Sequence, residues 1–113
     1  MKKKSFSPAQ VAALRVRFER CKQQIMALDW LSEGSVTENH PGTWRWTRKV
    51  KAKTVSVALS KEQYQALQQA IENWRELQEI LRRMQALSRR VIFETLPNPP
   101  RRKRLGKKVL GLV

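Results

Sequence analysis

Two apolar stripes at helical spacing, separated by a segment of alternating residues, constrain the fold more than any other feature. The first stripe recurs at intervals of three and four residues: Val11, Leu14, Phe18, Cys21, Ile25 and Leu28. This pattern is typical of a helix packed lengthwise against another helix. Ser7 and Pro8 form a helix start, because serine can cap free amides and proline needs no N–H partner there. We expect the helix to run from about Pro8 to Trp30 or Leu31.

The second stripe follows a capping box, in which Ser60 and Gln63 satisfy each other's backbone amides. Its apolar positions are Tyr64, Leu67, Ile71, Trp74, Leu77, Leu81, Met84, Leu87 and Val91, with Ile80 beside the stripe. The sequence Leu96-Pro97-Asn98-Pro99-Pro100 stops a helix, because proline cannot continue one. This predicts a long helix that ends at about Phe93.

The segment between the stripes alternates as a strand does. Residues Thr43 to Val50 and Thr54 to Leu59 each place apolar side chains on one side, and Lys51-Ala52-Lys53 connects them. A β-hairpin is therefore predicted, with Ser35 to Glu38 as a short third strand. Trp44 and Trp46 face the same way, and we assign them to packing against the helices, with base stacking as the alternative.

Together these patterns predict an α+β, mainly α fold: an antiparallel two-helix coiled-coil hairpin with a small β-hairpin of two or three strands at the corner. Residues 1–6 form a basic N-terminal arm, 7–94 the helix–β-hairpin–helix domain, and 95–113 a disordered basic tail. In the expected register, Leu28 lies near Tyr64, and charges pair across the helices: Arg15 and Arg17 with Glu76 and Glu79, and Lys22 with Glu72.

This register leaves the end of the longer helix uncovered and exposes Leu87, Val91 and Phe93. An apolar patch of this kind calls for a partner. We therefore expect a homodimer, or a partner protein, to cover these three residues.

The charge of the chain is strongly positive: 24 Lys and Arg stand against 9 Asp and Glu, which gives a net charge of +15 on 113 residues. Such a field attracts polyanions, and a basic tail is typical of an arm that meets a phosphate backbone. We therefore predict nucleic acid as the partner, with DNA favoured over RNA. The candidate contact residues lie in the hairpin, late in the second helix and in the tail: Arg45, Arg48, Lys49, Lys51, Lys53, Arg82, Arg83, Arg89, Arg90, Arg101, Arg102, Lys103, Arg104, Lys107 and Lys108.

Catalytic chemistry has little support in this sequence. The single His40 lies in a Pro-Gly turn, and the single Cys21 falls on an apolar helix face. No metal-ligand spacing, nucleophile motif or glycine-rich phosphate loop is present, so we expect a protein that is not an enzyme and needs no metal or cofactor. No apolar run approaches the roughly 18 residues of a membrane span, so we expect a cytosolic protein, free or associated with the nucleoid.

Several short motifs carry a resemblance. Gly34-Ser35-Val36, Asn39-His40-Pro41-Gly42, Val50-Lys51-Ala52-Lys53-Thr54 and Ile71-Glu72-Asn73-Trp74-Arg75-Glu76-Leu77 occur in that order. Over about residues 34–88, the chain resembles a family of small, uncharacterised prokaryotic proteins often encoded beside transposase or integrase genes. The cysteine cluster of many members is missing and Ala52 replaces a turn glycine, so no metal site transfers. The resemblance implies association with mobile DNA and brings no biochemical activity.

Two further functions compete with binding to DNA. A component of a ribonucleoprotein would use a basic tail to thread between RNA helices. A coiled-coil adaptor would bind a protein instead, and the apolar end of the tail could dock into a groove through Leu105, Val109, Leu110, Leu112 and Val113.

Overall fold

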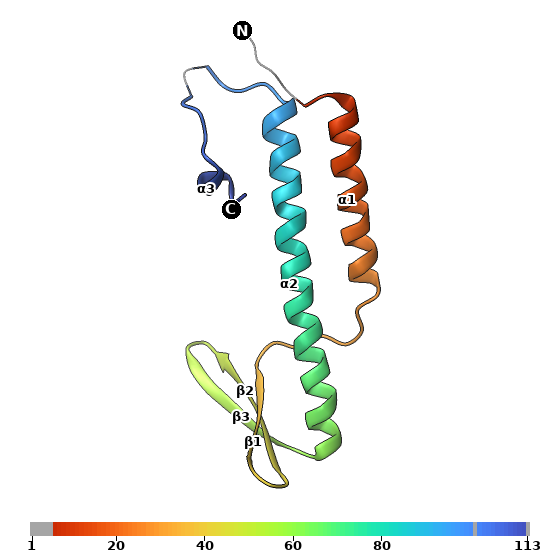
Figure 1. The fold of residues 1–113 in the computed structure, drawn as a ribbon. Helices are drawn as coiled ribbons and strands as arrows, with labels where there is room; N and C mark the ends of the chain where they lie inside the picture. The colour runs from red at the N-terminus through yellow and green to blue at the C-terminus, as the bar shows by residue number, and fades with distance from the viewer. Residues whose placement is uncertain (1–5, 101, 113) are drawn as a thin grey trace. The chain divides into compact units, whose positions relative to one another are not determined.

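The computed structural model describes residues 6–100 and 102–112 and has an α+β fold, as predicted. In chain order the elements are α1 (Pro8–Met26), β1 (Ser35–His40), β2 (Thr43–Val50), β3 (Lys53–Leu59), α2 (Lys61–Thr95) and α3 (Lys107–Leu110) (Figure 1). The chain divides into two compact units. One contains α1, α2 from Glu79 onward and α3, and the other spans Ala27–Gln78.

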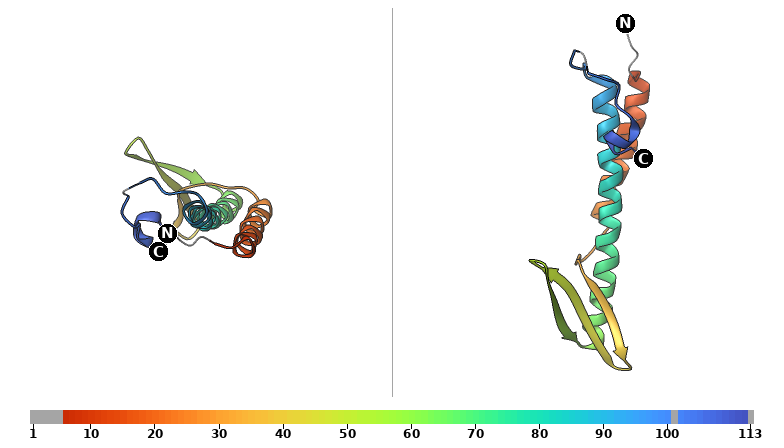
Figure 2. Two further views of the ribbon diagram at one scale, coloured as in Figure 1. Left: turned by 90° about the horizontal axis from the view of Figure 1, so that it is seen from above. Right: turned by 90° about the vertical axis from the view of Figure 1, so that its left-hand side faces the viewer.

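In the first unit, α1 packs antiparallel to the C-terminal half of α2 (Figures 1 and 2). Val11 and Leu14 of α1 line a small cavity together with Leu87 and Val91, whereas Gln24 accepts a hydrogen bond from Arg83 at 3.3 Å. Both helices begin with a capping box. Ser7 and Gln10 bond reciprocally at 2.7 and 3.2 Å, and Ser60 and Gln63 at 3.0 and 3.1 Å.

The apolar seam between these helices differs in one position from the prediction. Ile80 is 0% exposed, whereas Leu81 is 39% exposed. Leu77, Ile80, Met84, Leu87 and Val91 continue the spacing of three and four that a heptad seam requires, so Ile80 takes the place assigned to Leu81. On α1, Leu14 and Cys21 are buried, as predicted.

The predicted register of the two helices is wrong. Leu87 is only 6% exposed, because α1 covers it, and Val91 and Phe93 are half-buried. Leu87, Val91 and Phe93 therefore do not form the predicted uncovered patch at the end of α2. The first turns of α2 are occupied by the sheet, since Trp44 packs against Tyr64 with ring centroids 6.0 Å apart.

The predicted charge pairs between the helices are also absent from the ion pairs of the described residues. Arg15 and Lys22 both pair with Glu19 of their own helix, at 3.5 and 3.3 Å. Glu79 pairs with Arg82 at 2.6 Å, again within one helix. Oppositely charged side chains three or four residues apart on one helix pair without help from tertiary structure. The predicted register assigned the same charges to pairs between the two helices.

Helix α1 ends at Met26, four or five residues before the predicted end. The following segment leaves the helix to bond with the second unit's part of α2. Asn73 Nδ2 donates to the Trp30 carbonyl at 3.0 Å, and the Ser32 amide donates to the Ala70 carbonyl at 3.2 Å. These tertiary hydrogen bonds replace the last turn that periodicity alone would predict.

The second unit contains a three-stranded antiparallel sheet of order β1-β2-β3, with β2 in the centre (Figure 2). Trp46 is opposite Val36 on one side and Val57 on the other, and Thr47 is opposite Ser35 and Ser56. Residues directly opposite one another share a face of the sheet. One face is therefore rich in tryptophan and valine, and it is the face that meets α2.

Gly34 fixes the entry into the sheet. Its φ is +105°, and a Cβ there would lie 2.6 Å from Trp46 Nε1 and 2.7 Å from the Thr47 carbonyl oxygen. Trp46 Nε1 in turn donates to the Glu33 carbonyl at 3.0 Å. Only glycine allows this close approach of backbone and indole.

The described part of the tail differs from the predicted disorder. It forms the short helix α3, and Gly111 in the left-handed region, at φ 72°, ends that helix. Leu105, Leu110 and Leu112 are half-buried. The charge and prolines of this segment favoured disorder, whereas its leucines supply an apolar side that lies against the chain.

Candidate nucleic-acid interface

The second face of the sheet is polar and free of acid. By register it carries Ser35, Thr37, Arg45, Thr47, Lys49, Thr54, Ser56 and Ala58, which together we call the polar face. The guanidinium of Arg45 is held in place on this face, because Arg45 Nε donates to Ser56 Oγ of the neighbouring strand at 2.7 Å. The face thus combines a fixed arginine with hydroxyl groups, which are donors to phosphate and base edges.

Three lysines surround the turn that joins β2 to β3: Lys49, Lys51 and Lys53, which we call the turn lysines. All three are exposed. Among the ion pairs of residues 6–100 and 102–112, none involves Arg45 or a turn lysine. These four cations therefore remain available to an external anion.

The turn itself is tighter than predicted. Lys51 and Ala52 have φ values of 49° and 67°, and Lys53 already lies opposite Val50 at the start of β3. Two consecutive positive φ values are those of a type I′ turn, whose twist matches that of a two-residue β-hairpin. The rigid turn holds the turn lysines close to one end of the sheet.

Arg48 lies apart from these cations, on the tryptophan-rich face. Its guanidinium lies 5.3 Å from the centroid of the Trp46 ring, and its Nη1 is 3.6 Å from a Glu33 carboxylate oxygen. Its Nε is buried without a hydrogen-bond partner among the described residues. The structure thus places Arg48 in the packing between sheet and linker.

The two tryptophans pack as expected. Trp44 and Trp46 are half-buried, the first against Tyr64 and the second with its indole N–H bonded to Glu33. These contacts favour the packing role over base stacking.

The arginines late in α2 are each engaged by neighbours. Arg82 bonds to Glu79 at 2.6 Å, Arg83 to Gln24 and Arg89 to Gln85 at 2.9 Å, and Arg90 lies 5.7 Å from the Phe6 ring centroid. Arg82 is the one of these that forms an ion pair within the described residues. The cluster adds positive charge to the first unit.

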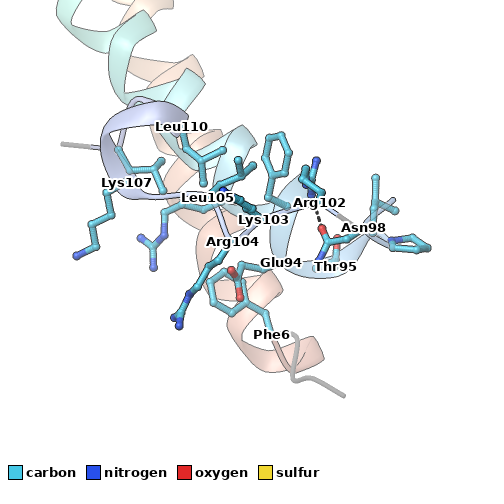
Figure 3. Close-up of a pocket in the computed structure, with 15 residues that line it drawn as sticks. Phe6, Glu94, Thr95, Asn98, Arg102, Lys103, Arg104, Leu105, Lys107 and Leu110 are labelled. Carbon is cyan, nitrogen blue, oxygen red and sulfur yellow. Dashed lines mark hydrogen bonds between the residues drawn. The ribbon is translucent and has the colours of Figure 1, made fainter. Parts of the chain in front are cut away.

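The tail cations surround a cavity of about 1050 Å³ between the tail and the end of α2 (Figure 3). Arg102 lies 5.3 Å from the Phe93 ring centroid and bonds to Asn98. The lining of the cavity includes Arg90, Arg102, Lys103, Arg104 and Lys107, and Glu94 is the only acid among the lining residues. Lys108 is exposed, and Arg101 lies outside the described residues.

This cavity is the feature that the sequence analysis missed. Phe6 and Phe93 contribute to it from chain segments far apart in sequence, and the leucines of the tail close one side. The spacing of the leucines in the tail was the available signal. In the alternative of a protein-binding adaptor these leucines would dock into a partner, whereas in the structure Leu105, Leu110 and Leu112 line a cavity of their own chain.

Exposed apolar side chains remain elsewhere on the described surface and offer room for a partner: Val16, Met26, Trp30, Leu31, Ile92, Leu96 and Val109. In the described part of the chain, no three His, Cys, Asp or Glu side chains gather as metal ligands. No helix among residues 6–100 and 102–112 has both the length and the apolarity to cross a membrane.

Comparison of the chain with protein-family models, curated proteins and solved structures gives no match.

Proposed function

We propose that the protein is a non-enzymatic nucleic-acid-binding protein that meets phosphate through the polar face and the turn lysines. The observation that carries this proposal is a set of four cations without ion pairs among the described residues: Arg45 and Lys49 on the acid-free polar face, and Lys51 and Lys53 at the adjoining turn. Lysine ammonium groups contact phosphate as point charges, and arginine is the commonest reader of base edges.

The remaining cations extend the same interaction. Lys103, Arg104, Lys107 and Lys108 are exposed in the tail and add attraction that does not depend on nucleotide sequence. Arg82, Arg83, Arg89 and Arg90 add to the positive field of the first unit. Arg48 belongs to the internal packing and contributes indirectly, by holding Glu33 away from the polar face.

Duplex DNA is the favoured ligand. A strand ribbon fits the major groove of B-DNA, whereas the deep, narrow major groove of duplex RNA does not admit side chains. The resemblance to proteins encoded beside transposase or integrase genes supports DNA as well, and with it the role of an accessory protein of a mobile genetic element. RNA remains the alternative ligand.

The proposal is tested by binding to a fluorescent DNA duplex between about 50 and 200 mM salt, with duplex RNA and single strands as competitors. The variant Lys49→Gln, Lys51→Gln, Lys53→Gln removes the turn lysines. Each lost phosphate contact reduces the slope of log K against log salt by about 0.9, so this variant should flatten the slope by about 2 to 3.

The matched control removes three exposed positive charges from the helices: Arg17→Gln, Arg20→Gln, Arg75→Gln. It has the same net charge as the turn variant, and we expect its slope to change by less than about 1. Equal flattening in both variants would contradict the proposed site and indicate diffuse attraction. Absence of salt-dependent binding in the unaltered protein would contradict the function itself, and preference for RNA competitors would favour the alternative ligand.

A further inference from the structure

The strand β3 is an open edge of the sheet without the features that usually protect such an edge. It pairs with β2 on one side, and from Thr54 to Leu59 it contains neither charge nor proline. Natural edge strands are blunted by charges, prolines or bulges, because unpaired backbone groups invite another strand. The opposite edge is protected in this way, since β1 is irregular between Glu38 and His40.

The turn geometry shows which backbone groups of β3 are free. In a type I′ turn the residue after the turn bonds back to the residue before it, so Lys53 bonds toward β2. Hydrogen-bonded and non-hydrogen-bonded pairs then alternate along the antiparallel ladder. The backbone N–H and C=O groups of Thr54, Ser56 and Ala58 therefore point outward, away from β2.

We propose that β3 pairs antiparallel with β3 of a second copy of the chain, about a two-fold axis at Ser56. In this pairing Ser56 lies opposite Ser56 of the partner subunit, and Val55 lies opposite Val57 of the partner subunit. Val55 and Val57 are 38% and 42% exposed on the tryptophan-rich face, and the pairing covers both at once. The inference does not depend on nucleic-acid binding.

Charge favours a second copy in this orientation. Lys53 is the one charged residue of β3, and it lies three residues from the axis. At about 3.4 Å per residue, Lys53 and Lys53 of the partner subunit are roughly 20 Å apart along the paired strands, well beyond a Debye length of about 8 Å. A parallel alignment would place these two ammonium groups side by side. The neutral edge is thus a place where two highly basic chains can meet.

The mass of the full-length protein in solution, freed of nucleic acid and measured by sedimentation equilibrium, tests this dimer. Ser56→Lys places two like charges opposite each other at the axis, so it should raise the dimer dissociation constant by about tenfold or more. Ser35→Lys is the matched control. Ser35 lies in the same row of the sheet as Ser56, on the β1 edge, so it adds the same charge away from the proposed contact.

A second measurement does not depend on the loss of an interaction. In a Cys21→Ala background, Ser56→Cys should form a disulfide-linked dimer under mild oxidation, whereas Ser35→Cys should not. A monomeric unaltered protein at every concentration measured overturns the proposal. Equal weakening by both lysine variants overturns it too, as does a dimer that survives Ser56→Lys in a variant whose circular dichroism shows it folded.

Discussion

Ala52 occupies a backbone conformation that favours glycine. Its φ is 67°, and Lys51 before it is also positive at 49°. A side chain in the left-handed region clashes with its own backbone at a cost of about 1 to 2 kcal/mol, which glycine avoids. The turn nevertheless forms, because seven cross-strand pairs, from Trp44–Leu59 to Val50–Lys53, hold the two strands together. The strain at Ala52 is local and should be separable from the rest of the fold.

Replacing Ala52 with glycine should therefore stabilise the protein. After the entropy that glycine loses on folding, we expect a gain of about 0.5 to 1 kcal/mol in the free energy of unfolding, measured with urea. Ala58→Gly is the control, because Ala58 lies in β3 and, among the described non-glycine residues, positive φ occurs at Lys51 and Ala52. That control should lose stability. A loss of stability in Ala52→Gly would contradict the strain assigned to the turn.

Residues whose effect is local could be read from the sequence, whereas residues that depend on tertiary contacts could not. The Ser60–Gln63 capping box forms as predicted, because both partners lie within one helical turn. The need for glycine at position 34 arises from Trp46, which follows it by twelve residues. Arg48 shares the sequence signature of its basic neighbours, and its packing role became visible once Glu33 and Trp46 were placed beside it.

At the scale of elements, helix α2 packs against different elements in each unit. Up to Gln78 it meets the linker and the sheet, through Ala70, Asn73 and Tyr64. From Glu79 onward it meets α1, with Ile80 and Leu87 buried. Periodicity predicted that α2 is one long helix. It did not predict where the packing partner of α2 changes, since both kinds of partner bury residues at the same spacing.

Truncation of the seam residues tests this assignment. Ile80→Ala should cost about 2 to 5 kcal/mol in the free energy of unfolding, because it leaves a cavity where the side chain is fully buried. Leu81→Ala, its neighbour on the exposed side, should cost less than about 1 kcal/mol. Urea unfolding of the two variants makes the comparison. Equal losses would mean that α1 does not pack on the Ile80 face.

At the scale of the whole molecule, the proposed function assigns the kind of ligand to net charge and the position of contact to the sheet. Of the net charge of +15, the helices and the tail hold most, yet several of their arginines are engaged by glutamate, glutamine or phenylalanine neighbours. Arg45 and Lys49 share the acid-free polar face, and Lys51 and Lys53 lie in and directly after the turn at one end of the sheet. The sequence predicted the excess charge and the hairpin, but it did not separate Arg48 from the contact surface.

The most direct test is an NMR titration of the isotope-labelled protein with a DNA duplex. If the account is correct, the amide signals of Arg45, Lys49, Lys51 and Lys53 shift progressively with added DNA. Signals from the exposed positions Arg17 and Arg20 of α1 should move much less. Shifts centred on α1, or no shifts at saturating DNA, would contradict the claim that this surface binds nucleic acid.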